Sequence, residues 1–294
     1  MKTRPCLCSF GFAAACFAFG VVGFAMVFAA TPGDTLSTEE IIAKHLESIG
    51  TKEARNELKT MMVVGKSHAV SKGRNAGETT GIVVIASDGE MSMIGMKFNN
   101  NDYPGEVIGF DGKDFTVGWQ SPGQRSILGN FMLSNEKTFK SGILGGVIST
   151  GWEMFNYNEE EGKLKCKGTS KIDGVKHHKC QYKPNGGSDL SITLFFHPEN
   201  FRHVRTEYRR IISGGQGLGV DDSARQREVR YKLQEDFSDF QDIGGLTLPH
   251  QYVITYEKQG GSESIDIEWR MDLADFKVNQ KIDPTGFKVD DIIS

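Results

Sequence analysis

The residues of this chain that could support metal chemistry are mainly its seven histidines. His177 and His178 are adjacent, so on a strand their side chains would point to opposite faces of a sheet. His197 and His203 flank a predicted turn, with neither a nearby cysteine pair nor the HExxH spacing of a helical zinc site. The sequence therefore predicts no metal site, and these histidines are expected to be exposed strand residues.

Two other motifs bear on catalysis and cofactor binding. Residues 214–219, GGQGLG, share the glycine content of a phosphate loop, but no Lys-Ser/Thr pair ends the motif and a strand-like stretch follows it. The GxSxG sequence of a nucleophile elbow does not occur. A hydrolase or transferase would need distant residues to converge in the fold, so we expect no enzymatic activity and no cofactor.

The cysteines favour a structural role. Cys166 and Cys180 flank Asp173-Gly174, a typical hairpin turn. A three-residue loop with a glycine bulge would pair the two cysteines directly, whereas a tight two-residue turn would offset them by one position. Directly opposed strand positions are close enough for a disulfide, which makes this pair a disulfide candidate.

The first thirty residues have the pattern of an export signal. Lys2 and Arg4 precede an uncharged stretch that runs from Pro5 to Ala30 and contains the other three cysteines. Small residues at its end predict cleavage after Ala29, so residues 1–29 are expected to be a signal peptide and residues 30–294 one exported domain. The stretch is long enough to cross a bilayer, so an uncleaved anchor formed by residues 5–30 is the alternative. Either form places the domain outside the cytoplasm, in the periplasm or cell envelope.

Most of the remaining chain has the alternation of β-strands, after one helix. Ser37 and Glu40 have the spacing of a capping box, and Gly50 ends the apolar face that follows. Residues 265–271, IDIEWRM, then illustrate the strand pattern, with apolar residues on one face and charged residues on the other. About eleven such segments joined by short turns predict a mostly β protein with a few helices. The strands would form a single large, strongly curved antiparallel sheet whose apolar face lies inside.

A curved sheet of this size has more inner surface than its own side chains can fill. We expect apolar strand residues to line a cavity there: Met62, Val64, Ile82, Val84, Met93, Phe115 and Val117. Residues 141–152, SGILGGVISTGW, are uncharged and rich in glycine, and five large side chains fall at helical spacing. These residues are predicted to form a lid over the cavity: Ile143, Leu144, Val147, Ile148 and Trp152. The alternative is a permanently packed plug with no ligand.

Several stretches together resemble the LolA/LolB-like group of bacterial outer-membrane lipoprotein carriers. They are EEIIAKHLESIG followed by VVGKS, GFDGKDFTV, SGILGGVISTGW, SKIDGVKHHKCQY with FFHPENF downstream, and DFSDFQDIGGLTLPHQYVITY. The resemblance implies an incomplete β-barrel of about eleven strands with a helical lid, around an apolar cavity that takes acyl chains of lipoproteins or related lipids. No site residue is transferred from the family to this chain.

These observations lead to two hypotheses about function. The first is a non-enzymatic carrier or acceptor that holds acyl chains of a lipoprotein or lipid and exchanges them with an envelope membrane protein. The second is a structural or interaction protein of the envelope on the same scaffold, packed solid. The formal net charge of −4 gives no reason to expect a nucleic-acid partner.

Overall fold

The computed structural model describes residues 36–72, 76–157, 162–213, 228–261, 264–289, 291 and 293. The predicted signal peptide, residues 1–29, and the glycine-rich residues 214–219 lie outside this part of the chain.

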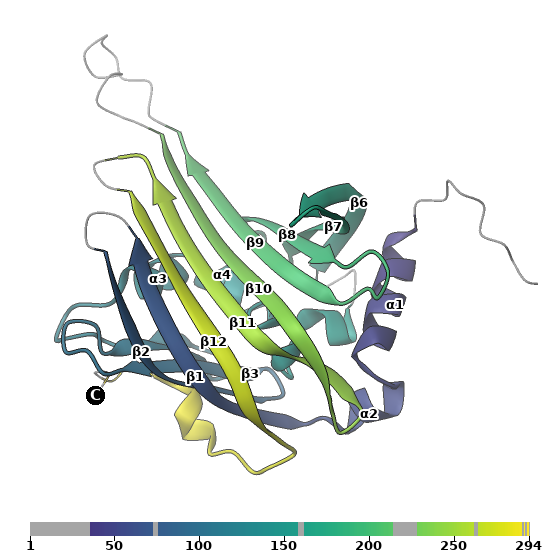
Figure 1. Cartoon of the computed structure of the whole chain (residues 1–294), viewed down its shortest axis with the longest axis horizontal. Helices are drawn as coiled ribbons and strands as arrows, with labels where there is room; N and C mark the ends of the chain where they lie inside the picture. Colours follow the sequence, from purple (N-terminus) through teal and green to yellow (C-terminus); the bar gives the residue numbers. More distant parts are fainter. Residues whose placement is uncertain are drawn as a thin grey trace, which may run out of the picture. The chain divides into compact units, whose positions relative to one another are not determined.

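In the described part of the chain, twelve antiparallel strands form one open, curved sheet (Figure 1). Their spatial order is β5-β4-β3-β2-β1-β12-β11-β10-β9-β8-β7-β6, so neighbours in space are neighbours in sequence except at the pair of β1 with β12. The end strands, β5 and β6, do not pair with each other, and the sheet is therefore not a closed barrel. The predicted fold class is confirmed, with one strand more than the expected eleven. The strands are β1 Thr60–Lys72, β2 Gly77–Asp88, β3 Met91–Phe98, β4 Gly105–Phe110, β5 Phe115–Val117, β6 Gly162–Ile172, β7 Val175–Pro184, β8 Ser191–Phe196, β9 His203–Ile212, β10 Val229–Ile243, β11 Leu246–Gln259 and β12 Ile265–Val278.

Short helices accompany the sheet. Helix α1 begins with the predicted capping box, in which the Glu40 amide donates to Ser37 Oγ and the Ser37 amide donates to Glu40 Oε2. Ile41 and Ile42 of α1 are buried in the core, as the predicted apolar face requires. The helices are α1 Thr38–Ile49, α2 Lys52–Glu57, α3 Ile127–Ser134, α4 Glu136–Phe139, and the 3₁₀ turns η1 Gly146–Ile148, η2 Glu153–Asn156 and η3 Pro284–Phe287.

The inner face of the sheet packs against the segment that contains α3, α4, η1 and η2. Leu128 and Met132 of α3, and Val147 and Ile148 of η1, are buried in one hydrophobic core with inward residues of the strands. The segment between β5 and β6 therefore fills much of the concave side of the sheet.

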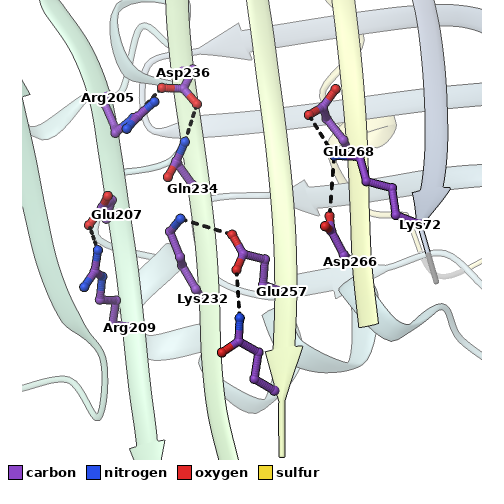
Figure 2. Close-up of polar contacts among 11 residues, drawn as sticks. Lys72, Arg205, Glu207, Arg209, Lys232, Gln234, Asp236, Glu257, Asp266 and Glu268 are labelled. Atoms are coloured by element: carbon purple, nitrogen blue, oxygen red, sulfur yellow. Dashed lines mark hydrogen bonds and ion pairs between the residues drawn. The ribbon is translucent and has the colours of Figure 1, made fainter. Parts of the chain in front are cut away.

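The outer face of the longest strands carries charged side chains in local pairs (Figure 2). Arg205 contacts Asp236 at 2.5 Å, and Arg209 contacts Glu207 at 2.6 Å. Such alternation of apolar inner and charged outer positions is what the sequence pattern predicts for these strands.

The C-terminal residues cover another part of the outer face. Phe287 of η3 is buried, and its carbonyl oxygen lies so close to Gly109 of β4 that a Cβ at Gly109 would be 2.3 Å from it. Beyond η3, the Val289 amide donates to Thr116 Oγ1. Part of the outer face of β4 and β5 is thus buried by the chain itself.

Candidate functional site

Five of the predicted cavity-lining residues lie on the outer face of the sheet. In β1, Met61 and Val63 are buried, whereas Met62 and Val64, which alternate with them, are half-buried on the opposite side. The same shift by one position applies in β2 and β3, where Val83, Ile85, Ile94 and Met96 point inward. The residues on the outer face are Met62, Val64, Ile82, Val84 and Met93. Ile82 is 54% exposed. The two remaining candidates, Phe115 and Val117, are buried.

The predicted lid is part of the core in this structure. Of its five residues, Ile143, Val147, Ile148 and Trp152 are buried and Leu144 is half-buried. The segment forms only one short 3₁₀ turn, η1, and not a continuous helix, because Gly142, Gly145 and Gly146 adopt positive φ angles. A Cβ at Gly146 would lie 3.0 Å from Phe237 Cζ, so the backbone packs directly on an aromatic ring of the sheet.

A buried carboxyl group holds this segment to the sheet. Glu235 of β10 accepts hydrogen bonds from the Gly145 amide at 2.8 Å, from Tyr208 Oη at 2.6 Å and from Tyr252 Oη at 2.5 Å. Burial raises the pKa of Glu235 to about 7, although the three hydrogen bonds oppose this shift. Because the donors come from the segment and two strands, Glu235 links all three.

A second buried carboxyl group binds the start of α3, which lies earlier in the connection between β5 and β6. Glu106 of β4 accepts hydrogen bonds from Tyr103 Oη at 2.6 Å and from Ser126 Oγ at 2.5 Å. Ser126 also accepts from the Gly129 amide at 2.8 Å and so caps α3. Burial raises the pKa of Glu106 to about 7, against the effect of the two hydrogen bonds. Neither glutamate is among the residues predicted from the sequence, although each is a charged residue at an inward position of an apolar alternation.

The expectation that His177, His178, His197 and His203 are exposed strand residues is wrong, because none of the four is exposed. His203 is buried beside Trp152, with ring centroids 5.1 Å apart, and His177 is buried as well. His178 is half-buried against the ring of Phe201. Burial lowers the pKa of His203 to about 3, so its imidazole is neutral near pH 7. Within the described ranges, no group of three or more His, Cys, Asp or Glu residues is placed to hold a metal ion.

Cys166 and Cys180 are joined by a disulfide between β6 and β7. The turn between these strands is the two-residue form, since Ile172 pairs with Val175. A bulge between Cys166 and Thr169 then shifts the register by one and places the cysteines directly opposite each other. The hairpin thus combines the tight turn and the direct cysteine pairing, which are alternatives on the sequence alone.

An open groove of about 470 Å³ remains beyond the packed core, where α3 lies over the ends of four long strands. We call it the α3 groove. Its lining comes from one side of α3 and from residues on the inner face of the sheet, near the ends of β9 to β12. The lining residues are Ile127, Asn130, Phe131, Ser134, Asn135, Arg210, Ile212, Tyr231, Tyr256, Lys258 and Ile265.

Aromatic rings form the deep part of the α3 groove. The Phe131 ring lies 5.2 Å from the Tyr256 ring and 6.2 Å from the Tyr231 ring, centroid to centroid. Isoleucines continue this surface toward solvent, and Ile127 and Ile212 are 43% and 45% exposed. The apolar lining of the groove therefore reaches solvent at these two residues.

The α3 groove is lined by two charged residues, Arg210 and Lys258, and each carries a positive charge. Arg210 contacts Asp189 at 3.5 Å, but Asp189 is 78% exposed, so water and salt weaken this pair. Lys258 has no ion pair with any described residue within 4.0 Å. The groove therefore combines an apolar floor with two positive groups available to an anion.

Neither a protein-family model nor a curated protein sequence matches this chain. Among solved structures, a LolA superfamily protein from Nitrosomonas europaea matches with 16% identity and a TM-score of 0.46, over 86% of this chain and 98% of that one. A DUF1329 family protein from Desulfovibrio piger matches with 12% identity and a TM-score of 0.44, again over 86% and 98%. A domain from Vibrio parahaemolyticus, described as sorting outer membrane lipoproteins, matches with 9% identity and a TM-score of 0.41, over 84% and 97%.

The likeness to the LolA group that the sequence pattern suggests is thus found again among solved structures. At these identities and TM-scores the matches carry no argument about ligand or partner. In the described part of the chain, no helix is both long and apolar enough to span a bilayer.

Proposed function

We propose that this protein is an exported carrier or acceptor of an acyl-bearing ligand in the bacterial cell envelope, a lipid or a lipidated protein. Residues 1–29 would act as the export signal, or residues 5–30 would remain as an anchor. The α3 groove carries this proposal, because its aromatic and isoleucine lining suits an acyl chain and its two cations suit an anionic group at the end of that chain.

The groove, and not the region under residues 141–152, is the proposed binding site. Each acyl methylene that leaves water contributes about 0.8 kcal/mol, so ten methylenes contribute about 8 kcal/mol before the cost of ordering. Arg210 and Lys258 would add affinity for a carboxylate or phosphate. Because the groove is open, a ligand could leave it without displacement of the buried core.

Two neighbouring isoleucines of β9 give a matched test. Ile212 lines the groove and is 45% exposed, whereas Ile211 lies on the other face of the same strand and is 60% exposed. Delipidated protein would be titrated with a fluorescent fatty acid, as the original chain and as Ile212→Glu and Ile211→Glu. We expect Ile212→Glu to bind at least ten times more weakly, because the carboxylate would be desolvated beside the acyl chain.

Ile211→Glu is expected to bind like the original chain. Equal binding by both variants would refute the assignment to the α3 groove, and no binding by any form would refute the carrier function. The role of the cations that line the α3 groove can be tested with Lys258→Met. This change should weaken binding of the fatty acid but not of its uncharged methyl ester.

A second function is supported by a different observation. The burial of Val147, Ile148 and Trp152 leaves the concave side of the sheet occupied by the chain itself. This packing favours a structural protein of the envelope that binds no lipid. Lipid that co-purifies with the protein, detected by mass spectrometry, would contradict this second function.

A further inference from the structure

The hairpin of β6 and β7 concentrates positive charge. Residues 162–184 contain seven lysines and one aspartate, a formal charge of +6. The whole chain has a formal charge of −4, so the remaining residues together carry −10. None of the seven lysines forms an ion pair with another described residue. Figure 1 shows β6 and β7 at one end of the sheet, beside α1.

Five of these lysines share one face of the hairpin. Leu164, Cys180 and Tyr182 are buried, so the residues that alternate with them point away from the core. We call this outward surface the lysine face. It consists of Lys163, Lys165, Lys167, Lys179 and Lys183, of which all but Lys179 are exposed.

The strand pairing brings like charges together on the lysine face. Lys163 lies directly opposite Lys183. Like charges in this arrangement destabilise an antiparallel pair. The disulfide between Cys166 and Cys180 cross-links the same part of the hairpin and opposes this repulsion. Charge that is concentrated at a cost to the local structure points to a function in binding an anionic partner.

Two apolar residues, Ile172 and Val175, flank the Asp173-Gly174 turn of the hairpin on the same side as the lysine face. Val175 is an even number of positions from Lys179 and Lys183 along β7 and so lies on the same face, and it pairs with Ile172 across the turn. Val175 is 43% exposed and Ile172 is half-buried. An acidic peptide or a nucleic acid would need no such apolar end, whereas a bilayer offers anionic headgroups beside a hydrocarbon layer.

We propose that the lysine face and the Ile172–Val175 tip form a docking surface for an anionic lipid bilayer. The lysines contact the headgroups and the tip enters the boundary between headgroups and acyl chains. This proposal does not depend on the α3 groove, since the two surfaces share no residue.

The test uses the full chain with vesicles of phosphatidylcholine alone and of phosphatidylcholine with phosphatidylglycerol. The quantity measured is the ratio of the two partition coefficients, so any attraction of residues 5–30 to both bilayers cancels. Each lysine near an anionic surface contributes about a fivefold factor. We therefore expect the triple variant Lys163→Gln, Lys165→Gln and Lys183→Gln to lower the ratio about 100-fold.

Three exposed lysines elsewhere provide the matched control. Lys52, Lys113 and Lys281 are exposed and form no ion pair with a described residue. Their simultaneous change to glutamine alters the net charge equally and should leave the ratio within about threefold. An equal fall in both triple variants would show that only net charge matters, and would overturn the proposal.

A substitution at the tip can distinguish binding to a bilayer from binding to an acidic polymer. Val175→Ser should weaken binding to the anionic vesicles but leave binding to poly-glutamate unchanged. If Val175→Ser leaves vesicle binding unchanged, or if the original chain binds poly-glutamate more tightly than the vesicles, the surface recognises an acidic chain and the bilayer assignment is wrong. Loss of fatty-acid binding in Ile212→Glu has no bearing on this outcome, because that change lies in the α3 groove.

Discussion

Glu235→Gln should remove a defined part of the pH dependence of stability. Burial raises the pKa of Glu235 from 4.5 to about 7 in the folded protein. The folded chain therefore holds this proton more tightly than the unfolded chain. The stabilisation is fully present below pH 4.5 and is lost as the pH rises through about 7. A shift of this size corresponds to about 3 kcal/mol in the free energy of unfolding.

The assay is urea unfolding of the original chain and of Glu235→Gln, followed by tryptophan fluorescence at pH values from about 4 to about 8.5. The difference between the two profiles isolates Glu235, because Glu106 and the buried histidines are present in both. Glutamine has no proton to lose, and it accepts fewer hydrogen bonds than a carboxylate. We expect the advantage of the original chain to be largest at the acid end and to shrink by about 3 kcal/mol toward alkaline pH.

Parallel profiles for the two proteins would refute this reasoning, because they would mean that Glu235 has the same proton affinity in both states. The control is Glu57→Gln, the same chemical change at an exposed position of α2. Its profile should run parallel to that of the original chain. A pH-dependent difference of similar size in the control would show that the effect comes from net charge and not from the buried site.

Three further changes test the packing of the connection between β5 and β6 and the stability of the β6–β7 hairpin. Gly146→Ala should cost more stability than Gly174→Ala in thermal unfolding, because both glycines have positive φ but only Gly146 is crowded by neighbouring side chains; equal losses would contradict the close packing. Replacement of both Cys166 and Cys180 by alanine should lower the free energy of unfolding by about 2 to 3 kcal/mol, and an unchanged Tm would argue against a stabilising cross-link. Ser126→Ala should cost about 2 kcal/mol or more in urea unfolding, since it removes both a helix cap and a donor to a buried carboxyl group; a loss below about 0.5 kcal/mol would contradict these roles.

The sheet and the first helix could be predicted from the sequence because their patterns are local. Residues 265–271 alternate strictly, and Ser37 and Glu40 form the capping box that their spacing predicts. The fold class follows from such segments and from the short turns between them, which force antiparallel pairing.

The inward face of the early strands could not be predicted, for a physical reason. Residues 61–64 and 82–85 are apolar at every position, so alternation gives no preference between the faces. In the neighbouring strands β4 and β5, part of the outer face is covered by residues near the C-terminus, such as Phe287. This contact between distant parts of the chain leaves no local signal in the strand sequence.

The α3 groove is a product of tertiary structure as well. Phe131 and Tyr256 are separated by more than a hundred residues, and only the packing of α3 over the sheet brings their rings together. By contrast, Glu235 could have been found from the sequence, as a charged residue between Leu233 and Phe237 at inward positions of one strand.

The pairing of β1 with β12 has a consequence for how the chain folds. All other neighbours in the sheet are consecutive hairpins, so β1 to β5 and β6 to β12 can each assemble from local contacts. The contact between Met61 and Val278 closes a loop of more than two hundred residues, and this seam runs through the middle of the sheet. Synthesis must therefore reach the last strand before the two halves can join, which makes the seam a late and slow step of folding.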